Sequence, residues 1–203
     1  ADDSVYVSSI MELLRETEIS DCKIGIGSYV SCDLSTSEET LVQPPAGNSD
    51  ALALHLAKKM GLWRFVLSTN SFGDIRFTNH KMGEDFLYIN LVLNRSNQIF
   101  TSSNIVYKYF HGGNGNLTSN PSVMREMIGI INSIKKIKPL TSSAATFRVF
   151  AIQKLTLSLL KNLKVTEKII EKFMLFVNLL SHPIYLLKLL VSLKHKEHGL
   201  INE

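Results

Sequence analysis

Apolar residues recur at helical spacing in two segments near the start of the chain. In residues 4–17 they lie three or four positions apart, which predicts a helix with Ser4 as its N-cap. Residues 50–59 show the same spacing, and Gly61 is the residue at which that helix is expected to stop. The apolar residues of the first segment are Val7, Ile10, Met11 and Leu14.

Alternation of apolar and polar residues, or a short apolar run, predicts strands in the rest of the N-terminal part. The segments with this character are 22–34, 62–69, 74–78, 86–93 and 98–110. The polar stretch 35–49 contains Pro44-Pro45 and predicts a surface loop. Because the turns between the later segments are too short for parallel crossovers, the sequence predicts an antiparallel sheet of about four or five strands with flanking helices.

The C-terminal part of the chain has helical spacing throughout. The predicted helices follow one another with short connections, which is typical of antiparallel neighbours in a bundle. They cover residues 121–138, 144–163, 166–180 and 183–197. The fold class is therefore α+β, with a C-terminal helical bundle. Residues 1–140 are expected to form a mixed domain with 141–203 packed on it, or the two parts form one continuous domain.

Residues 173–193 are the most apolar stretch and carry one formal charge, Lys188. A membrane span is the alternative to consider, but His182-Pro183 divides the stretch into two helices that are each too short to cross a bilayer. The last helix is apolar on nearly every side, so we expect another protein chain, identical or different, to cover part of it. The alternative is burial against the sheet. The residues expected to bind the partner are Phe173, Phe176, Leu180, Ile184, Tyr185, Leu187 and Leu190.

Charge is distributed unevenly between the two halves. Residues 1–100 hold 8 Lys/Arg and 13 Asp/Glu, and residues 101–203 hold 14 Lys/Arg and 5 Asp/Glu, which gives −5 and +9. The two halves are expected to attract each other, either within the chain or between subunits. The alternative is a nucleic-acid interface, because several of the lysines recur at helical spacing. Its candidates are Lys135, Lys136, Lys138, Lys154, Lys161, Lys164, Lys168 and Lys172.

The two cysteines, Cys22 and Cys32, lie on either side of Gly27. A hairpin that turned at Gly27 would let the thiols meet, whereas a single strand would hold them about 30 Å apart. We expect two free, partly buried thiols and an intracellular location, cytoplasmic or nuclear. The acidic, polar N-terminus predicts no signal peptide.

Motifs of known chemistry are weak in this sequence. Residues 23–29 contain a Gly-x-Gly without the third glycine and helix of a dinucleotide site, and the glycine-rich segment 111–116 lacks the end of a phosphate-binding loop. No catalytic residue, metal ligand or cofactor site is therefore assigned. The candidate for a carboxylate-rich cleft lies in the predicted turns, at Asp74, His80, Glu84 and Asp85.

These patterns predict a non-enzymatic interaction or assembly subunit that binds another protein, or a second copy of itself, through apolar helical surface. Nucleic-acid binding by the basic helix faces and an enzyme of unrecognised class are the alternatives. Membrane contact is the less favoured interpretation, and the sequence does not identify the partner.

Overall fold

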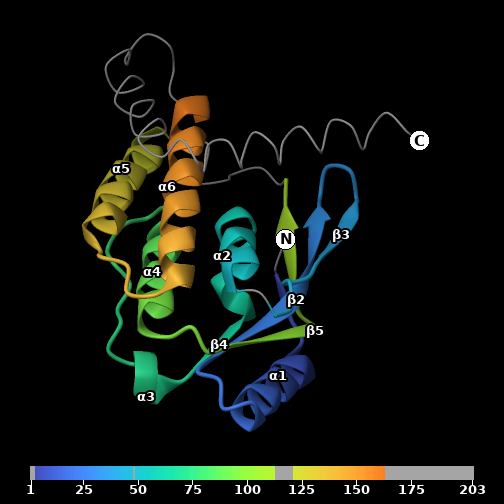
Figure 1. Cartoon of the computed structure of the whole chain (residues 1–203). Coiled ribbons are helices and arrows are strands. Elements are labelled where there is room, and N and C mark those ends of the chain that lie inside the picture. The colour runs from blue at the N-terminus through green and yellow to red at the C-terminus, as the bar shows by residue number, and fades with distance from the viewer. Residues whose placement is uncertain (1–2, 48, 113–120, 163–203) are drawn as a thin grey trace, which may run out of the picture.

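The computed structural model describes residues 3–47, 49–112 and 121–162, and it shows an α+β fold (Figure 1). One five-stranded sheet carries helices on both faces. Its strands are β1 (Ser4–Val5), β2 (Ile24–Asp33), β3 (Glu39–Val42), β4 (Phe65–Leu67) and β5 (Ile99–His111). The helices are α1 (Val7–Ile19), α2 (Ser49–Lys58), the 3-10 turn η1 (Leu62–Arg64), α3 (Thr69–Phe72), α4 (Glu84–Arg95), α5 (Pro121–Lys136) and α6 (Ser142–Asn162).

The sheet is mixed, so the predicted antiparallel arrangement is wrong in part. The strand order is β1-β5-β2-β3, and β4 also pairs with β2. β2 and β5 are parallel, with Ile24 opposite Ile99 and Tyr29 opposite Tyr107, whereas the other pairs are antiparallel. A parallel pair needs a long crossover, and here the chain supplies it through α2, α3 and α4.

The main error lies in residues 86–93, which were predicted as a strand and belong to helix α4. The segment is apolar at nearly every position because α5 and α6 cover it on several sides, so its apolar residues show no helical period. Two signals did mark a helix start. Gly83 adopts a left-handed conformation, and Glu84 and Asp85 supply acidic residues in the first turn.

Other boundaries also differ from the prediction. Residues 74–78 form no strand, and only Phe65–Leu67 of the predicted segment 62–69 pairs in the sheet. The predicted loop 35–49 contains the edge strand β3, and Ser4 lies in β1 rather than capping α1. Strands at 22–34 and 98–110 are confirmed by β2 and β5. Helices at 4–17, 50–59, 121–138 and 144–163 are confirmed, with shifted ends, by α1, α2, α5 and α6.

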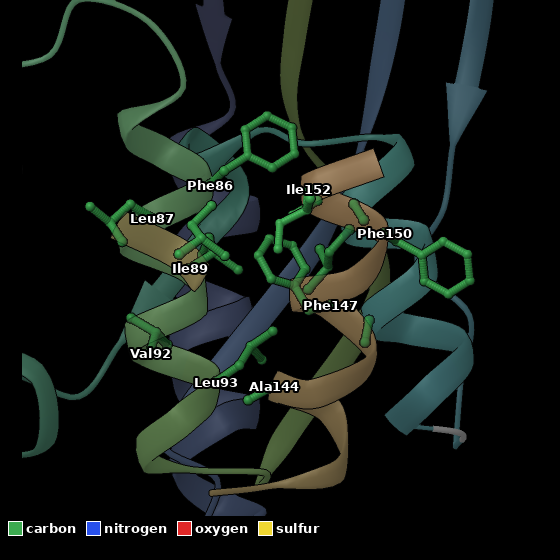
Figure 2. Close-up of a cluster of buried hydrophobic side chains, with 14 of the residues drawn as sticks. Phe86, Leu87, Ile89, Val92, Leu93, Ala144, Phe147, Phe150 and Ile152 are labelled. Atoms are coloured by element: carbon green, nitrogen blue, oxygen red, sulfur yellow. The ribbon is translucent and has the colours of Figure 1, made fainter. Parts of the chain in front are cut away.

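The main hydrophobic core lies between the sheet and the helices α2, α4, α5 and α6. Ile24 and Ile26 of β2 supply the sheet side, and Phe147 of α6 is fully buried near the centre. Figure 2 shows side chains of α4 and α6 meeting between the two helices, where the rings of Phe86 and Phe147 lie 6.3 Å apart. Because this core joins residues before and after position 140, α6 is packed on the N-terminal part of the chain.

Helix α1 packs on the opposite face of the sheet (Figure 1). A side chain at Gly25 would overlap Thr17 of α1, and a Cβ at Gly27 would lie 2.6 Å from Val106 Cγ1. The two glycines of β2 therefore allow α1 and the neighbouring strand to approach closely. Leu13 and Thr17 are the buried residues of α1, and Thr17 Oγ1 donates to Leu13 O at 2.6 Å.

The predicted helices 166–180 and 183–197 lie outside the described residues, and so does the apolar stretch 173–193. Within residues 3–47, 49–112 and 121–162, no helix combines the length and the apolar character that crossing a membrane requires.

The core predicts a sharp contrast between two residues of α6. Phe147 has no exposed surface, whereas Leu157 is 43% exposed. Phe147→Ala should lower the free energy of unfolding by about 3–5 kcal/mol, because it leaves a cavity between α4 and α6. Leu157→Ala should change it by less than about 0.5 kcal/mol. Urea unfolding followed by circular dichroism measures both values, and equal losses would contradict the described packing.

Candidate functional site

The outer face of α1 carries exposed apolar side chains. Val7, Met11 and Leu14 are 68%, 59% and 37% exposed, and they follow the i, i+4, i+7 spacing of one helix face. The neighbouring face, with Ile10, Leu13 and Thr17, is turned toward the sheet. The helix is therefore apolar on its packed face and also on an adjoining face that nothing in the described residues covers.

The exposed surface continues into the residues before α1. Val5 and Tyr6 are both exposed, and Tyr6 N donates to Val106 O at 3.0 Å, which fixes this segment beside β5. We call the set Val5, Tyr6, Val7, Met11 and Leu14 the α1 stripe. Several exposed apolar residues on and next to one helix face are typical of an interaction site, whereas single exposed apolar residues are ordinary.

A cleft of about 460 Å³ opens at the C-terminal end of the α1 stripe. Leu14 belongs to both, and the far wall comes from β4 and the start of α3. We call this hollow the α1 cleft. Its volume lies in the range of small-ligand pockets, and it also suits a single large side chain. Its lining residues are Leu14, Thr17, Glu18, Asp21, Cys22, Lys23, Val66, Leu67, Ser68, Thr69 and Asn70.

The charges in the α1 cleft are two carboxylates and one ammonium group. Lys23 Nζ lies 2.8 Å from Asp21 Oδ1, and this hydrogen bond lowers the pKa of Asp21. Asp21 has a positive φ of 48°, an uncommon conformation for a residue with a side chain. Glu18 has no ion pair within the part of the chain that the structure describes. The cleft therefore has an excess of one negative charge.

The cysteines are both free, as predicted. Cys32 is buried within β2, and Cys22 lies just before that strand at the α1 cleft. Because residues 24–33 form one continuous strand, the hairpin that would have brought the thiols together does not occur. Burial raises the pKa of Cys32, which makes a thiolate there less accessible.

A buried arginine is the second unusual feature. Arg64 is 1% exposed and contacts no carboxylate in the described residues. Its Nη2 donates to Lys59 O at 2.7 Å, its Nη1 lies 3.2 Å from His55 Nε2, and its guanidinium lies 5.2 Å from the Tyr29 ring centre. Burial lowers the pKa of Arg64 to about 10. These contacts tie η1 to α2 and β2.

Aromatic rings cluster around Trp63, the residue before this arginine. Trp63 stacks on Tyr107 with ring centres 4.1 Å apart and meets Tyr29 edge-on at 4.6 Å. Tyr109 also stacks on Trp63, at 5.6 Å. Because the rings contact one another, the cluster has the character of a structural clamp between η1 and the β2–β5 pair. No sequence signal marked this grouping, because it joins three segments, at Tyr29, Trp63 and Tyr107, that are more than 30 positions apart along the chain.

The predicted carboxylate-rich cleft does not assemble as one site. Asp74 pairs with Arg95, with Oδ2 at 2.7 Å from Nη2, and His80 Nδ1 lies 4.0 Å from Glu126 Oε2. Asp85 stands apart near Lys154, and burial, assisted by neighbouring Glu84, raises its pKa to about 6. In the described residues no three metal-ligating side chains converge. Each of these acids therefore has a separate environment.

The predicted binding residues have different outcomes. The partner-binding set from Phe173 to Leu190 lies outside the described residues, as do Lys164, Lys168 and Lys172. Lys161 lies in α6. Lys135, Lys136 and Lys138 lie at and after the end of α5, where Lys135 O accepts a bond from Arg148 at 2.6 Å. Lys154 Nζ donates to Lys58 O at 2.7 Å and lies over the Phe86 ring.

Comparisons with known proteins do not decide between these features. Neither a protein-family model nor a curated protein matches the chain. The function is therefore argued from the described residues and from the sequence.

Sequence reasoning identified α1 but missed its exposed stripe. Val7, Ile10, Met11 and Leu14 were grouped as one apolar face, whereas Ile10 packs inward and the other three are exposed. A signal for the stripe was present in the sequence. The apolar residues of α1 occupy a wider arc around the helix axis than packing on one face of a sheet requires.

The His55–Arg64 contact predicts a pH-dependent stability. Burial, assisted by the charge of Arg64, lowers the pKa of His55 from 6.5 to about 4 in the folded state. The unfolded chain therefore takes up this proton first as the pH falls. The stabilising contribution is complete above about pH 6.5 and is lost as the pH falls toward 4.

His55→Gln keeps an acceptor for Arg64 but removes the titration. In urea titrations at a series of pH values, the loss of unfolding free energy between pH 6.5 and 4 should be smaller in the variant than in the wild type. Asp85 titrates in the same window with the opposite sign, but it is present in both proteins and cancels in the difference. Parallel curves for the two proteins would contradict this assignment.

Proposed function

We propose that this chain is a non-enzymatic interaction subunit that binds another protein chain through exposed apolar helical surface. The observation that supports this most directly is the α1 stripe, of which Val7, Met11 and Leu14 project from a helix that is already anchored by Leu13 and Thr17. Association would remove this surface from water at a gain of about 25 cal/mol per Å² of apolar area.

The sequence of residues 166–198 extends the proposal to a second surface. The stretch 173–193 is rich in Leu and carries one charge. The partner-binding set Phe173, Phe176, Leu180, Ile184, Tyr185, Leu187 and Leu190 belongs to this stretch and remains part of the proposed interaction function.

The polar side chains that could take part in catalysis bond to separate partners, and this also favours a binding function. Asp74, His80 and Arg64 each have partners in different parts of the fold. A catalytic site requires nucleophile, base and electrostatic stabiliser to converge on one reacting atom. An apolar surface beside a cleft, in contrast, needs only a complementary partner.

Site-specific photo-crosslinking tests the proposal. A photoreactive phenylalanine analogue at position 11 should give a discrete cross-linked product in cells that make this protein, because Met11 lies in the middle of the α1 stripe. Leu14→Glu should abolish that product by placing a charge in the contact. The same analogue at position 140, where Leu140 is exposed but lies outside the stripe, is the matched control.

The mass of the product decides the identity of the partner. A product of twice the chain mass indicates a second copy, and another discrete mass indicates a different protein. Absence of a product at position 11, or an identical pattern at positions 11 and 140, would contradict the proposed function.

A further inference from the structure

The α1 cleft is placed where a partner lying along the α1 stripe would reach it. Leu14 is the last residue of the stripe and part of the cleft wall, and Glu18 follows one helical turn later on the same face. Whatever covers Val7, Met11 and Leu14 can therefore continue into the cleft without a change of direction. The inference below rests on the proposed function.

The walls of the cleft carry both apolar and polar side chains. Leu14, Val66 and Leu67 offer apolar contact, while Glu18, Asp21 and the polar side chains of residues 68–70 supply acceptors. A side chain with an apolar stem and a polar, donor-rich head fits this combination. A purely apolar side chain would leave the acceptors without partners, which costs free energy.

The charges in the α1 cleft indicate which charge the polar end of an entering side chain should carry. Lys23 is neutralised by Asp21 at 2.8 Å, which leaves the Glu18 carboxylate as the unbalanced charge of the cleft. The surrounding segment is acidic as well, because residues 3–23 hold five acids and two bases. The five acids are Asp3, Glu12, Glu16, Glu18 and Asp21, and the two bases are Arg15 and Lys23. An anionic head would be repelled, so the complementary head is cationic.

We propose that the α1 cleft receives an arginine side chain from the partner segment that packs along the α1 stripe. Arginine presents five donors in a planar fork, which matches a carboxylate flanked by hydroxyl and amide acceptors better than the single ammonium group of lysine does. Its stem lies against Leu14, Val66 and Leu67, and its guanidinium bonds to Glu18. The partner is therefore an amphipathic helix with an arginine at one end of its apolar face.

A displayed peptide library tests this partner chemistry. The library consists of helical peptides of about four turns, with leucine fixed at i, i+4 and i+7 and the other positions randomised. Selection on the full chain should enrich arginine at one position, adjacent to the leucine face. Selection on Glu18→Lys should replace that enrichment by glutamate or aspartate at the same position.

A double-mutant cycle on the best peptide then measures the contact. Replacing its arginine by methionine should weaken binding about tenfold, because one charge-assisted hydrogen-bonded contact is lost. Glu18→Gln should weaken the arginine peptide by a similar factor and leave the methionine peptide unchanged. Glu12→Gln is the matched control, because Glu12 is on the same helix but bonds to Asn104 Nδ2 at 3.0 Å, away from the cleft.

The outcomes separate this inference from the proposed function. Peptides that bind, lose binding on Met11→Glu and show no arginine preference would overturn the arginine assignment while leaving the stripe as an interaction site. Peptides whose binding is unaffected by Met11→Glu, or a selection that yields no binder, would overturn both. If the cross-linked partner is a second copy, the arginine must come from this chain, and charge reversal at its arginines should identify it.

Discussion

The fold depends on the burial of β2 between two layers of helices. This strand pairs with β3, β4 and β5, so its backbone hydrogen bonds link most of the sheet. One face places Ile24 and Ile26 in the main core, and the other uses Gly25 and Gly27 to admit α1 and Val106. A side chain at Gly25 would overlap Thr17 and force α1 away from the sheet, and a side chain at Gly27 would overlap Val106 of β5.

That close approach determines what α1 can present to solvent. The helix needs only a narrow inward face, because Thr17 lies against Gly25 and Leu13 packs in the small core with Val106 and Tyr107. An amphipathic helix of this kind would normally be polar elsewhere. The apolar residues Val7, Met11 and Leu14 are therefore not explained by packing within the described part of the chain. Exposure of these apolar side chains to water is unfavourable, and this supports the proposal that the surface binds a partner.

The elements that sequence reasoning found are those with a clear period. Helices α1, α2, α5 and α6 each have apolar residues at helical spacing, and β2 and β5 are bounded by turn residues. The failures occur where burial hides the period or where a strand is too short to show one. Residues 86–93 are apolar on almost every side, and β3 is a four-residue edge strand whose first three residues are exposed. The parallel pairing of β2 and β5 was not predictable once a helix between them had been assigned to the sheet.

The candidate site was less predictable than the fold, because its parts come from distant segments. The α1 cleft joins residues 14–23 with residues 66–70, which the pairing of β4 with β2 brings together. The exposure of Met11 depends on which of two adjoining apolar faces of α1 packs on the sheet, and Gly25 of β2 favours the face that carries Thr17. A sequence pattern gives the width of an apolar arc but not its orientation.

The structure shows where part of the negative charge of the first half of the chain lies. The acidic excess of the first half is concentrated partly in residues 3–23, on and around the helix that carries the α1 stripe. Apolar contact supplies most of the free energy of association but distinguishes poorly between partners, whereas charge restricts which apolar segments can approach. The α1 stripe combines both effects, because it is apolar and ends at a cleft that contains the Glu18 carboxylate. On the proposed arrangement, acidic or uncharged amphipathic helices that bury the same apolar area would bind this surface more weakly.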